Sequence, residues 1–254
     1  MGQFFCIFNN MERKFYLDIF PQPDDTTCGP TCLHAVYRYF GINIPLQQVI
    51  SEVKSLEEGG TLAVYLGLHA LDHGFYATLY TYNLQVFDPT WFSENKHYLS
   101  IKLSEQLLYK KNTKFQNASR AYLYFLNRGG QICFDDLTAG LLRRYLKSKK
   151  PILTGLSATY LYNCARERAT GNRLHYDDIR GEPTGHFVVL TGYDQNARNV
   201  WIADPLKPNP FSESDQYAVN INRLICAIML GILTYDAYLL IIEPQKKYEE
   251  QCKI

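Results

Sequence analysis

The sequence predicts an α+β fold in which helices come first and an antiparallel sheet comes last. Apolar residues recur at helical spacing before Pro151, and after it they gather into short runs separated by turn residues. The 254 residues can bury a full core without disulfides or metals, and no linker rich in glycine, serine or proline divides them. We therefore expect a single domain.

Three amphipathic helices are predicted first. Each has apolar residues on one face and ends near a glycine, which is favoured just past the end of a helix. The first helix starts at Cys28 and has Pro30 in its first turn, where the missing N–H removes no helical hydrogen bond. The predicted helices cover residues 28–40, 45–58 and 61–73.

The middle of the chain is predicted to contain an aromatic-rich segment and a helical section. Aromatic residues with partial alternation favour two short strands, at residues 75–82 and 84–87, or one interrupted strand. The helical section around residues 91–150 is expected to be an insertion into the domain. Its helices are predicted at residues 102–111, 115–127 and 137–149.

The sheet is predicted in the carboxyl-terminal half, as apolar runs bounded by turn residues. Residues 165–185 carry charges of both signs in near balance, which indicates a solvated loop beside the sheet. The nearly continuous apolar run at residues 224–233 indicates a buried helix. The strands are predicted at residues 152–156, 186–193, 200–203 and 238–242.

Charge and hydropathy exclude several classes of protein. Lysine and arginine total 26 and aspartate and glutamate total 25, so there is no basic field of the kind that dominates nucleic-acid binding. The longest apolar run has about ten residues, whereas a membrane helix needs roughly 20. The first residues, which include a second candidate start at Met11, lack a secretory signal. We therefore expect a soluble cytoplasmic protein that binds no nucleic acid and has no integral membrane segment.

No metal or cofactor is expected. The seven cysteines are an odd number and widely spread, which indicates free thiols. Cys28 and Cys32 are four residues apart, but no second cysteine pair completes a zinc site. His69 and His73 have a spacing that suits a metal, yet the glutamate of a His-Glu-x-x-His motif is absent. We interpret these two histidines as part of a partly exposed helix face.

Cys28 is placed where a thiol becomes a nucleophile. A cysteine in the first turn of a helix faces unpaired backbone N–H groups and the positive end of the helix dipole, which favour thiolate over thiol. Gly29 removes a side chain beside the sulfur. Gln22, on the loop entering the helix, can aim its amide at the oxygen of a carbonyl under attack. Together with the backbone N–H of Cys28 it is expected to form an oxyanion hole.

The carboxyl-terminal half supplies a base and a residue to orient it, both of which a thiolate nucleophile needs. His186 begins an apolar strand, and Asp204 follows the next predicted strand. If these strands pair through the turn at residues 194–199, the start of one lies beside the end of the other, and His186 and Asp204 become neighbours. Asp88 repeats the strand-end pattern before Pro89, but there we interpret it as a turn cap.

The segments that carry these residues resemble a known family. Gln22, the run Cys-Gly-Pro-Thr-Cys-Leu from Cys28, the run Gly-His-Phe-Val-Val-Leu around His186 and the Asp-Pro pair at Asp204 are similar to cysteine-peptidase family 39 of the papain-like clan. The match covers about 20 positions. It implies a papain-like fold with Cys28 as nucleophile, His186 as base, Asp204 as orienting residue and Gln22 as oxyanion donor.

The resemblance implies a peptidase that hydrolyses an amide bond of a peptide or protein substrate through a covalent thioester on Cys28, without a cofactor. The best-known members cut bacteriocin precursors after a double-glycine leader, and they are usually fused to a membrane transporter with an ATPase. This chain shows neither a span nor a phosphate-binding glycine loop, so cleavage of such leaders is not expected of it.

Two other functions remain open. The same thioester attacked by an amine would make the protein an acyltransferase or transpeptidase, and a relative without catalysis would bind peptides only. The expected domain organisation is an amino-terminal extension at residues 1–15, a papain-like domain at residues 16–245 and a tail at residues 246–254.

Overall fold

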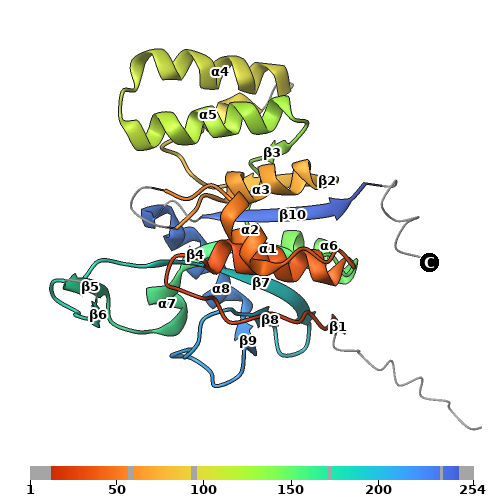
Figure 1. Ribbon diagram of the computed structural model, residues 1–254, viewed down its shortest axis with the longest axis vertical. Helices are drawn as coiled ribbons and strands as arrows, with labels where there is room; N and C mark the ends of the chain where they lie inside the picture. Colours follow the sequence, from red (N-terminus) through yellow and green to blue (C-terminus); the bar gives the residue numbers. More distant parts are fainter. Residues whose placement is uncertain (1–12, 57–59, 93–95, 171–172, 235–236, 246–254) are drawn as a thin grey trace, which may run out of the picture.

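One sheet covered by helices on both faces makes up most of the structure, which is a computed structural model (Figure 1). It describes residues 13–56, 60–92, 96–170, 173–234 and 237–245. Most of the predicted extension, residues 1–12, and the whole predicted tail lie outside these described residues. Within them, no helix has the length and apolar character needed to cross a membrane.

The sheet has the strand order β3-β2-β10-β4-β7-β8-β9, and the two residues of β1 pair with the far end of β7. All neighbours are antiparallel except β2 and β3, which are parallel. The predicted α+β class is therefore confirmed. The strands of this sheet are β1 (Arg13–Lys14), β2 (Phe75–Thr81), β3 (Gln131–Cys133), β4 (Ile152–Ser157), β7 (Gly185–Asp194), β8 (Asn199–Ala203), β9 (Gln216–Asn220) and β10 (Tyr238–Pro244).

The central strands are apolar on both sides because both faces of the sheet are covered. Along β10, Leu240 and Ile242 belong to one hydrophobic cluster, and Leu239 and Ile241 belong to the other. All four side chains are buried. The sequence of such a strand is a continuous run of apolar residues rather than an alternation of apolar and polar residues.

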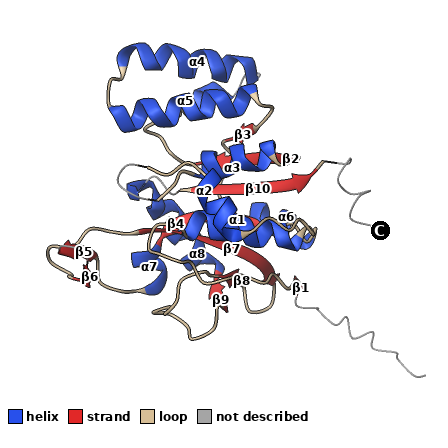
Figure 2. Cartoon of the chain, viewed as in Figure 1, coloured by secondary structure: helices blue, strands red, loops and turns tan. Residues whose placement is uncertain are grey.

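The helices divide between the two faces (Figure 2). On one face α1 and α3 supply Leu33, Val36 and Leu66 to the core, and on the other face α6 and α8 supply Leu142 and Leu224. The helices are α1 (Cys28–Tyr39), α2 (Leu46–Glu52), α3 (Ala63–Asp72), α4 (Lys96–Tyr109), α5 (Thr113–Asn127), α6 (Ala139–Lys147), α7 (Ala158–Tyr162) and α8 (Ile221–Leu230), with short 3₁₀ turns at Pro89–Phe92 and Gly231–Thr234.

The hairpin of α4 and α5 lies at one end of the molecule, beyond β3 (Figure 1). Several α5 residues belong to the core, and two of their contacts are especially close. The hydroxyl of Tyr122 donates a hydrogen bond of 2.9 Å to that of Tyr238 on β10. Phe125 is fully buried and lies so close to Gly67 of α3 that a Cβ at that glycine would be 2.8 Å from the ring. Residues 91–150 contribute β3 and α6 to the central sheet and its cover as well as the helical hairpin.

Three element predictions were wrong, and two predicted helices have other bounds: α2 ends at Glu52 rather than at residue 58, and α4 begins at Lys96 rather than at residue 102. Residues 84–87 form a turn, because the Asn83 side chain accepts the backbone N–H of Gln85 and its carbonyl accepts those of residues 86 and 87. The charged segment 165–185 is not a plain loop, since β5 (Glu167–Thr170) and β6 (Arg173–Tyr176) form a hairpin in it. The apolar run 224–233 is buried on one face only, and Leu233 is 66% exposed.

Candidate active site

Cys28 is the first residue of α1, as the sequence predicts. Its neighbour Thr27 is the N-cap residue, and the carbonyl of Thr27 accepts both the backbone N–H and the hydroxyl of Thr31. The first backbone N–H groups of a helix have no partner within the helix, so they are available to an anion beside Cys28. The Cys28 residue is 9% exposed and borders a pocket of about 640 Å³.

Gln22 borders the same pocket. Its backbone N–H donates to the carbonyl of Pro205, which fixes the loop before α1 against the segment after β8. Its side-chain Nε2 donates to the carbonyl of Asp24 at 2.9 Å. Asp24 in turn accepts the N–H and the hydroxyl of Thr26. This chain of local hydrogen bonds holds the Gln22 amide in place and leaves one of its two N–H groups for a ligand.

His186 and Asp204 are neighbours in space. The strands β7 and β8 pair antiparallel, with Val189 opposite Ala203, so the start of one strand lies beside the end of the other. The Nε2 atom of His186 is 2.9 Å from Oδ1 of Asp204. The predicted strand pairing is confirmed, and it accounts for how residues 18 positions apart come into contact.

Asp204 is fully buried, and hydrogen bonds saturate both of its carboxylate oxygens. Besides His186, the backbone N–H of Leu206 donates to Oδ1. The hydroxyls of Tyr162 and Tyr217 and the Nδ2 atom of Asn209 donate to Oδ2, at 2.8, 2.5 and 2.9 Å. A buried carboxylate with this many donors keeps its negative charge.

The sequence analysis did not identify the three side chains that donate to Oδ2. Tyr162 and Tyr217 come from α7 and β9, and nothing in their local sequence separates them from the other tyrosines among the 20 in the chain. Asn209 carries a weak signal, because it follows Asp204 within a proline-containing loop where an amide is a common turn residue.

The charges of the buried pair support each other. Burial alone would lower the pKa of His186, but the charge of Asp204 and hydrogen bonds to Asp204 and Cys28 raise it to about 10. Burial alone would raise the pKa of Asp204, but the charge and hydrogen bond of His186 and the other donors hold it below its ordinary value. At neutral pH the pair is therefore an imidazolium and a carboxylate.

Cys28 and His186 line the same pocket, and Cys28 contributes to the raised pKa of the ring. Since Asp204 occupies Nε2 of the ring, Nδ1 is the nitrogen left for the thiol. The pocket at this point is lined by the loop before α1, by residues 60–62, by the β5–β6 hairpin and by the start of β7. The four residues singled out from the sequence thus come from distant segments and meet at one pocket or directly behind it.

The competing residues lie elsewhere or are occupied. Cys32 is fully buried, its Sγ lies 3.2 Å from the carbonyl of Phe187, and burial raises the pKa of its thiol well above the ordinary value. Asp88 accepts the N–H and the hydroxyl of Thr90, as expected of a turn cap. The five described cysteines are all free, and Cys6 and Cys252 lie outside the described residues.

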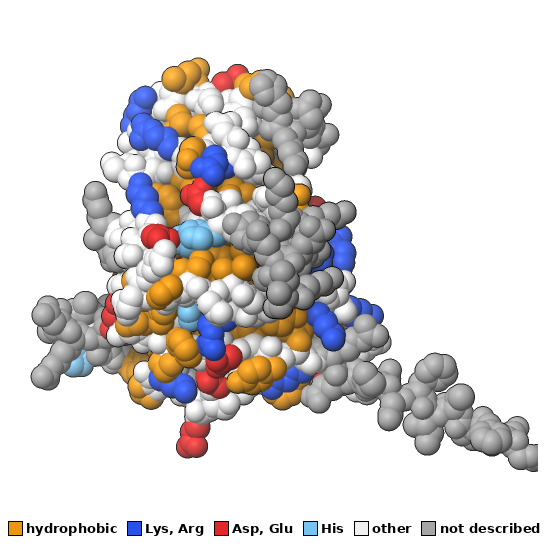
Figure 3. Space-filling model, turned by 45° about the vertical axis from the view of Figure 1, so that its right-hand side comes forward, with side chains coloured by type: hydrophobic (Ala, Val, Ile, Leu, Met, Phe, Trp, Pro, Cys, Tyr) orange, Lys and Arg blue, Asp and Glu red, His pale blue; other side chains and the backbone are white. Residues whose placement is uncertain are grey.

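Charges are mixed over the surface. On the face shown in Figure 3, lysine and arginine side chains are scattered among acidic and apolar ones. Apart from Cys28 and His186, the described lining residues of the pocket carry more negative than positive groups, with Asp25, Glu167 and Glu182 against Lys114.

Several solved structures have a similar backbone at low sequence identity. A C39-like peptidase from Bacillus anthracis is 15% identical, with a TM-score of 0.48, and the alignment covers 90% of this chain and 95% of that one. The peptidase domain of Streptococcus ComA, a bifunctional ABC transporter of a quorum-sensing pathway, is 15% identical with a TM-score of 0.42, over 91% and 100% of the two chains. Xylellain, a cysteine protease from Xylella fastidiosa, is 11% identical with a TM-score of 0.43, over 92% and 85%.

A comparison with curated proteins finds no match. A comparison with protein-family models finds one that spans most of the chain, residues 15–224. The matched range runs from just after β1 into α8, and it includes Gln22, Cys28, His186 and Asp204. The chain therefore belongs to the Peptidase_C39 like family of papain-like cysteine peptidases.

Proposed function

We propose that this peptidase cleaves peptide bonds with Cys28 as nucleophile, His186 as proton carrier, Asp204 as the residue that orients His186, and Gln22 as an oxyanion donor. The observation that carries the proposal is the buried His186–Asp204 pair, whose second ring nitrogen is left for a thiol at the start of α1. A nucleophile, a base and a residue that orients the base are the three groups that nucleophilic catalysis by a thiolate requires.

In the first step the Cys28 thiolate attacks the carbonyl carbon of the substrate, and a carbon–sulfur bond forms. The carbonyl electrons move to oxygen, where the Cys28 backbone N–H and the free N–H of the Gln22 amide stabilise the negative charge. The intermediate collapses as the carbon–nitrogen bond breaks. The proton on Nδ1 of His186 passes to the departing amine, and a thioester remains on Cys28.

In the second step water attacks the thioester while His186 takes one of its protons. The carbon–sulfur bond then breaks, the acid product leaves, and the thiolate and imidazolium are restored. Asp204 keeps the ring of His186 oriented throughout, because its hydrogen bond to Nε2 is maintained in both protonation states. An amine in place of water would give acyl transfer through the same thioester.

The charge of the pocket points to a substrate that carries basic side chains. Besides the Cys28–His186 pair, three carboxyl groups and one lysine line it, so lysine or arginine near the scissile bond gains a favourable interaction there and glutamate does not. We expect a peptide library with basic side chains flanking the scissile bond to be cleaved with a higher kcat/KM than its acidic counterpart, by about tenfold. The difference should shrink in 1 M salt, which screens exposed charges.

The rate at which an alkylating reagent modifies Cys28 tests the proposed pair. The rate is measured by peptide mass spectrometry as the pH is lowered from about 8.5, where an ordinary thiol titrates, to about 5. We expect Cys28 to stay reactive at low pH, and the exposed Cys226 serves as the internal comparison. In His186→Ala the low-pH reactivity of Cys28 should disappear, and in the control His175→Ala it should remain.

A Cys28 that follows the pH profile of Cys226 in the wild-type protein would contradict the proposed thiolate–imidazolium pair. Product analysis then decides the reaction. Cleavage that is lost in Cys28→Ala, with products whose masses do not change when an amine is added, supports hydrolysis over acyl transfer. A Cys28→Ala protein that still forms product would show that the nucleophile is another residue.

A further inference from the structure

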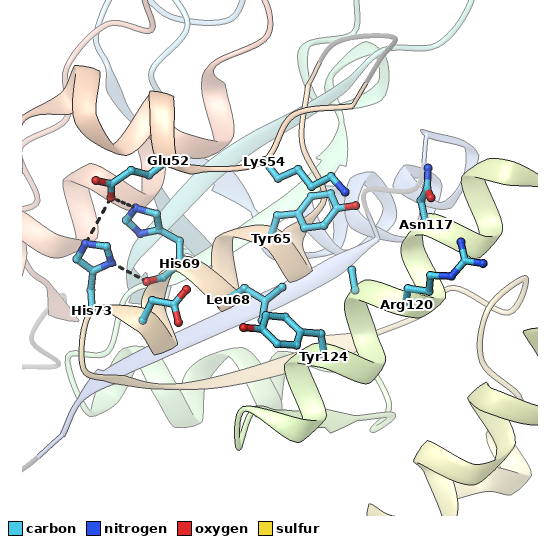
Figure 4. A pocket seen from close by; sticks show the side chains of 11 residues that line it. Glu52, Lys54, Tyr65, Leu68, His69, His73, Asn117, Arg120 and Tyr124 are labelled. Atoms are coloured by element: carbon cyan, nitrogen blue, oxygen red, sulfur yellow. Dashed lines mark hydrogen bonds and ion pairs between the residues drawn. The ribbon is translucent and has the colours of Figure 1, made fainter.

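A second cluster of chemically active side chains lies outside the candidate active site. Glu52 at the end of α2, His69 on α3 and His73 just after α3 bring one ligand atom each within 4.8 Å of one another (Figure 4). They lie at one end of a pocket of about 610 Å³ that shares no lining residue with the pocket at Cys28. His69 is buried and His73 half-buried, so the predicted partly exposed helix face is correct for His73 alone.

The spacing of these atoms suits a tetrahedral metal ion. The Nε2 atom of His69 is 3.1 Å from Oε2 of Glu52, and the Nε2 atom of His73 is 3.5 Å from the same oxygen. Two ligands about 2.0 to 2.2 Å from a tetrahedral zinc ion lie about 3.3 to 3.6 Å apart. The observed separations are close to these values without any ion, so small side-chain rotations complete the geometry.

The groups behind these atoms hold them in the orientation that a metal needs. The Nδ1 atom of His73 is 2.9 Å from the carbonyl of His69, which can only accept, so Nδ1 carries the proton and Nε2 has a free lone pair. The Nδ1 atom of His69 is 2.8 Å from the hydroxyl of the fully buried Tyr37, which can accept in the same way. Metal-binding histidines typically donate their second N–H to such partners.

The carboxylate is oriented too. Nε2 of Gln48 donates to Oε1 of Glu52 at 2.8 Å, which turns Oε2 toward the two imidazoles. Among the residues that the structure describes, Glu52 has no lysine or arginine as an ion-pair partner. The neighbouring cations are engaged elsewhere, since Arg128 pairs with Asp72 and Lys54 lies over the ring of Tyr65.

Protonation of the two imidazoles satisfies the three ligand atoms only in part. The rings of His69 and His73 are stacked with centroids 4.1 Å apart, so two imidazolium charges would repel each other across the stack. A neutral His69 can donate an Nε2 proton to Glu52, but the Nδ1 proton of His73 leaves the Nε2 lone pair of His73 facing the same carboxylate oxygen. A single dication shared by all three ligands removes that repulsion.

We propose that Glu52, His69 and His73 bind one divalent transition-metal ion of the Zn²⁺ class, with its remaining coordination position open to the neighbouring pocket. Two imidazole nitrogens and one carboxylate oxygen suit zinc, whereas calcium and magnesium take oxygen ligands. Three protein ligands and an open position are the arrangement of sites that bind a further small ligand. The ion also joins α2 to α3, because Glu52 belongs to α2, His69 belongs to α3 and His73 directly follows α3.

Zinc binding is measured by calorimetry on metal-free Cys28→Ser protein, so that the candidate nucleophile does not compete for the ion. We expect one equivalent of Zn²⁺ to bind and to raise the melting temperature, with no comparable binding of Ca²⁺ or Mg²⁺. Glu52→Gln keeps the shape of the side chain and should weaken zinc binding by about 100-fold or more, and His73→Ala should do the same. The matched control Glu105→Gln replaces an exposed carboxylate paired with Lys102 and should change nothing.

NMR of the imidazole nitrogens supplies a second readout that does not depend on affinity. Zinc should shift the Nε2 signals of His69 and His73 and leave their Nδ1 atoms protonated. Zinc bound equally well by Glu52→Gln and His73→Ala would place the ion elsewhere and overturn the proposal, as would the absence of binding to the folded parent protein. Equally tight binding of Ca²⁺ would overturn the assigned class of metal. None of these outcomes depends on peptidase activity.

Discussion

Asp204 controls the charge of His186, and its own charge depends on hydroxyl donors from two other elements. Replacing Tyr217 by phenylalanine removes one hydrogen bond to Oδ2 while the ring still fills its place. A hydrogen bond to a charged group contributes about 1.5 to 3 kcal/mol to stability, so we expect the free energy of unfolding to fall by about that amount. Urea unfolding at pH 7 measures it. The control Tyr176→Phe, at an exposed tyrosine, should be neutral, and equal stabilities for both variants would mean that Asp204 does not need this donor.

Gln22 is the other residue whose role can be separated from folding. Because its side chain contributes to the fold only through a bond to the Asp24 carbonyl, Gln22→Ala should fold normally. Loss of one oxyanion donor usually lowers kcat by about 10² to 10³, and we expect a fall of at least 10² with a much smaller change in KM. Steady-state kinetics on a cleaved peptide gives both constants. Gln195→Ala, on the surface, is the control, and an unchanged kcat in Gln22→Ala would remove Gln22 from the oxyanion hole.

Local sequence patterns single out some of the residues of the two sites and not others. Cys28 could be singled out because a helix start is visible in its own neighbours, and His186 and Asp204 because each lies at a strand end. Their catalytic roles stay predictions. Glu52 and Tyr217 could not be singled out, because each acquires its meaning from a residue on another element and no local pattern records that contact.

At the scale of elements, the start of α1 is held by close packing as well as by hydrogen bonds. The sequence analysis assigned Gly29 to leaving room beside the sulfur, but the space above its Cα is filled by α3 and the segment before it. A Cβ at Gly29 would be 2.7 Å from Cγ2 of Thr61, 3.4 Å from Leu66 and 3.5 Å from Phe187. Glycine is needed here for packing between elements.

Gly29→Ala should therefore displace the first turn of α1 or Thr61. Overpacking of this kind costs about 1 to 3 kcal/mol, which exceeds the gain of about 0.5 to 1 kcal/mol from replacing glycine in a helix. Thermal unfolding measures the net change in stability, and we expect Gly29→Ala to be less stable than the parent protein. Gly140→Ala is the matched control in α6, because there the nearest atom would be at 3.5 Å and no loss should occur. A Gly29→Ala protein as stable as Gly140→Ala would show that Thr61 yields without cost.

Elements with strong local signals were predicted and those defined by their partners were not. The helices α1, α3 and α5 were predicted to within three residues at each end. The short strand β3 and the strand β9 were missed because three to five residues carry too little periodicity, and pairing with β2 and β8 defines them. The hairpin of β5 and β6 was missed because its residues are charged, which is typical of loops.

At the scale of the molecule, helices on both faces turn the central strands into buried apolar runs, and His186 begins one such run. The same burial that makes the core makes the His186–Asp204 pair sensitive to pH. Below about pH 6.5 an unfolded histidine is protonated as well, so the pair contributes its full stability there. The folded pKa is about 10, and the contribution is lost as the pH rises toward that value. In Asp204→Asn only burial acts strongly on His186, and the pKa moves downward instead.

The difference in unfolding free energy between the parent and Asp204→Asn should therefore be larger at pH 6.5 than at higher pH, and it should shrink as the pH rises toward the folded pKa of His186, which Asp204 still raises when Cys28 is replaced. Both proteins carry Cys28→Ser, so that no thiol titration at this site enters the comparison, and urea unfolding at pH 6.5, 8 and 9.5 gives the difference. Groups that do not contact Asp204 are the same in both proteins and cancel, and burial raises the pKa of Tyr162 and of Tyr217 above the measured range. A difference that does not change with pH would mean that His186 is neutral in the folded protein, and an NMR titration of its ring would then show the same low pKa directly.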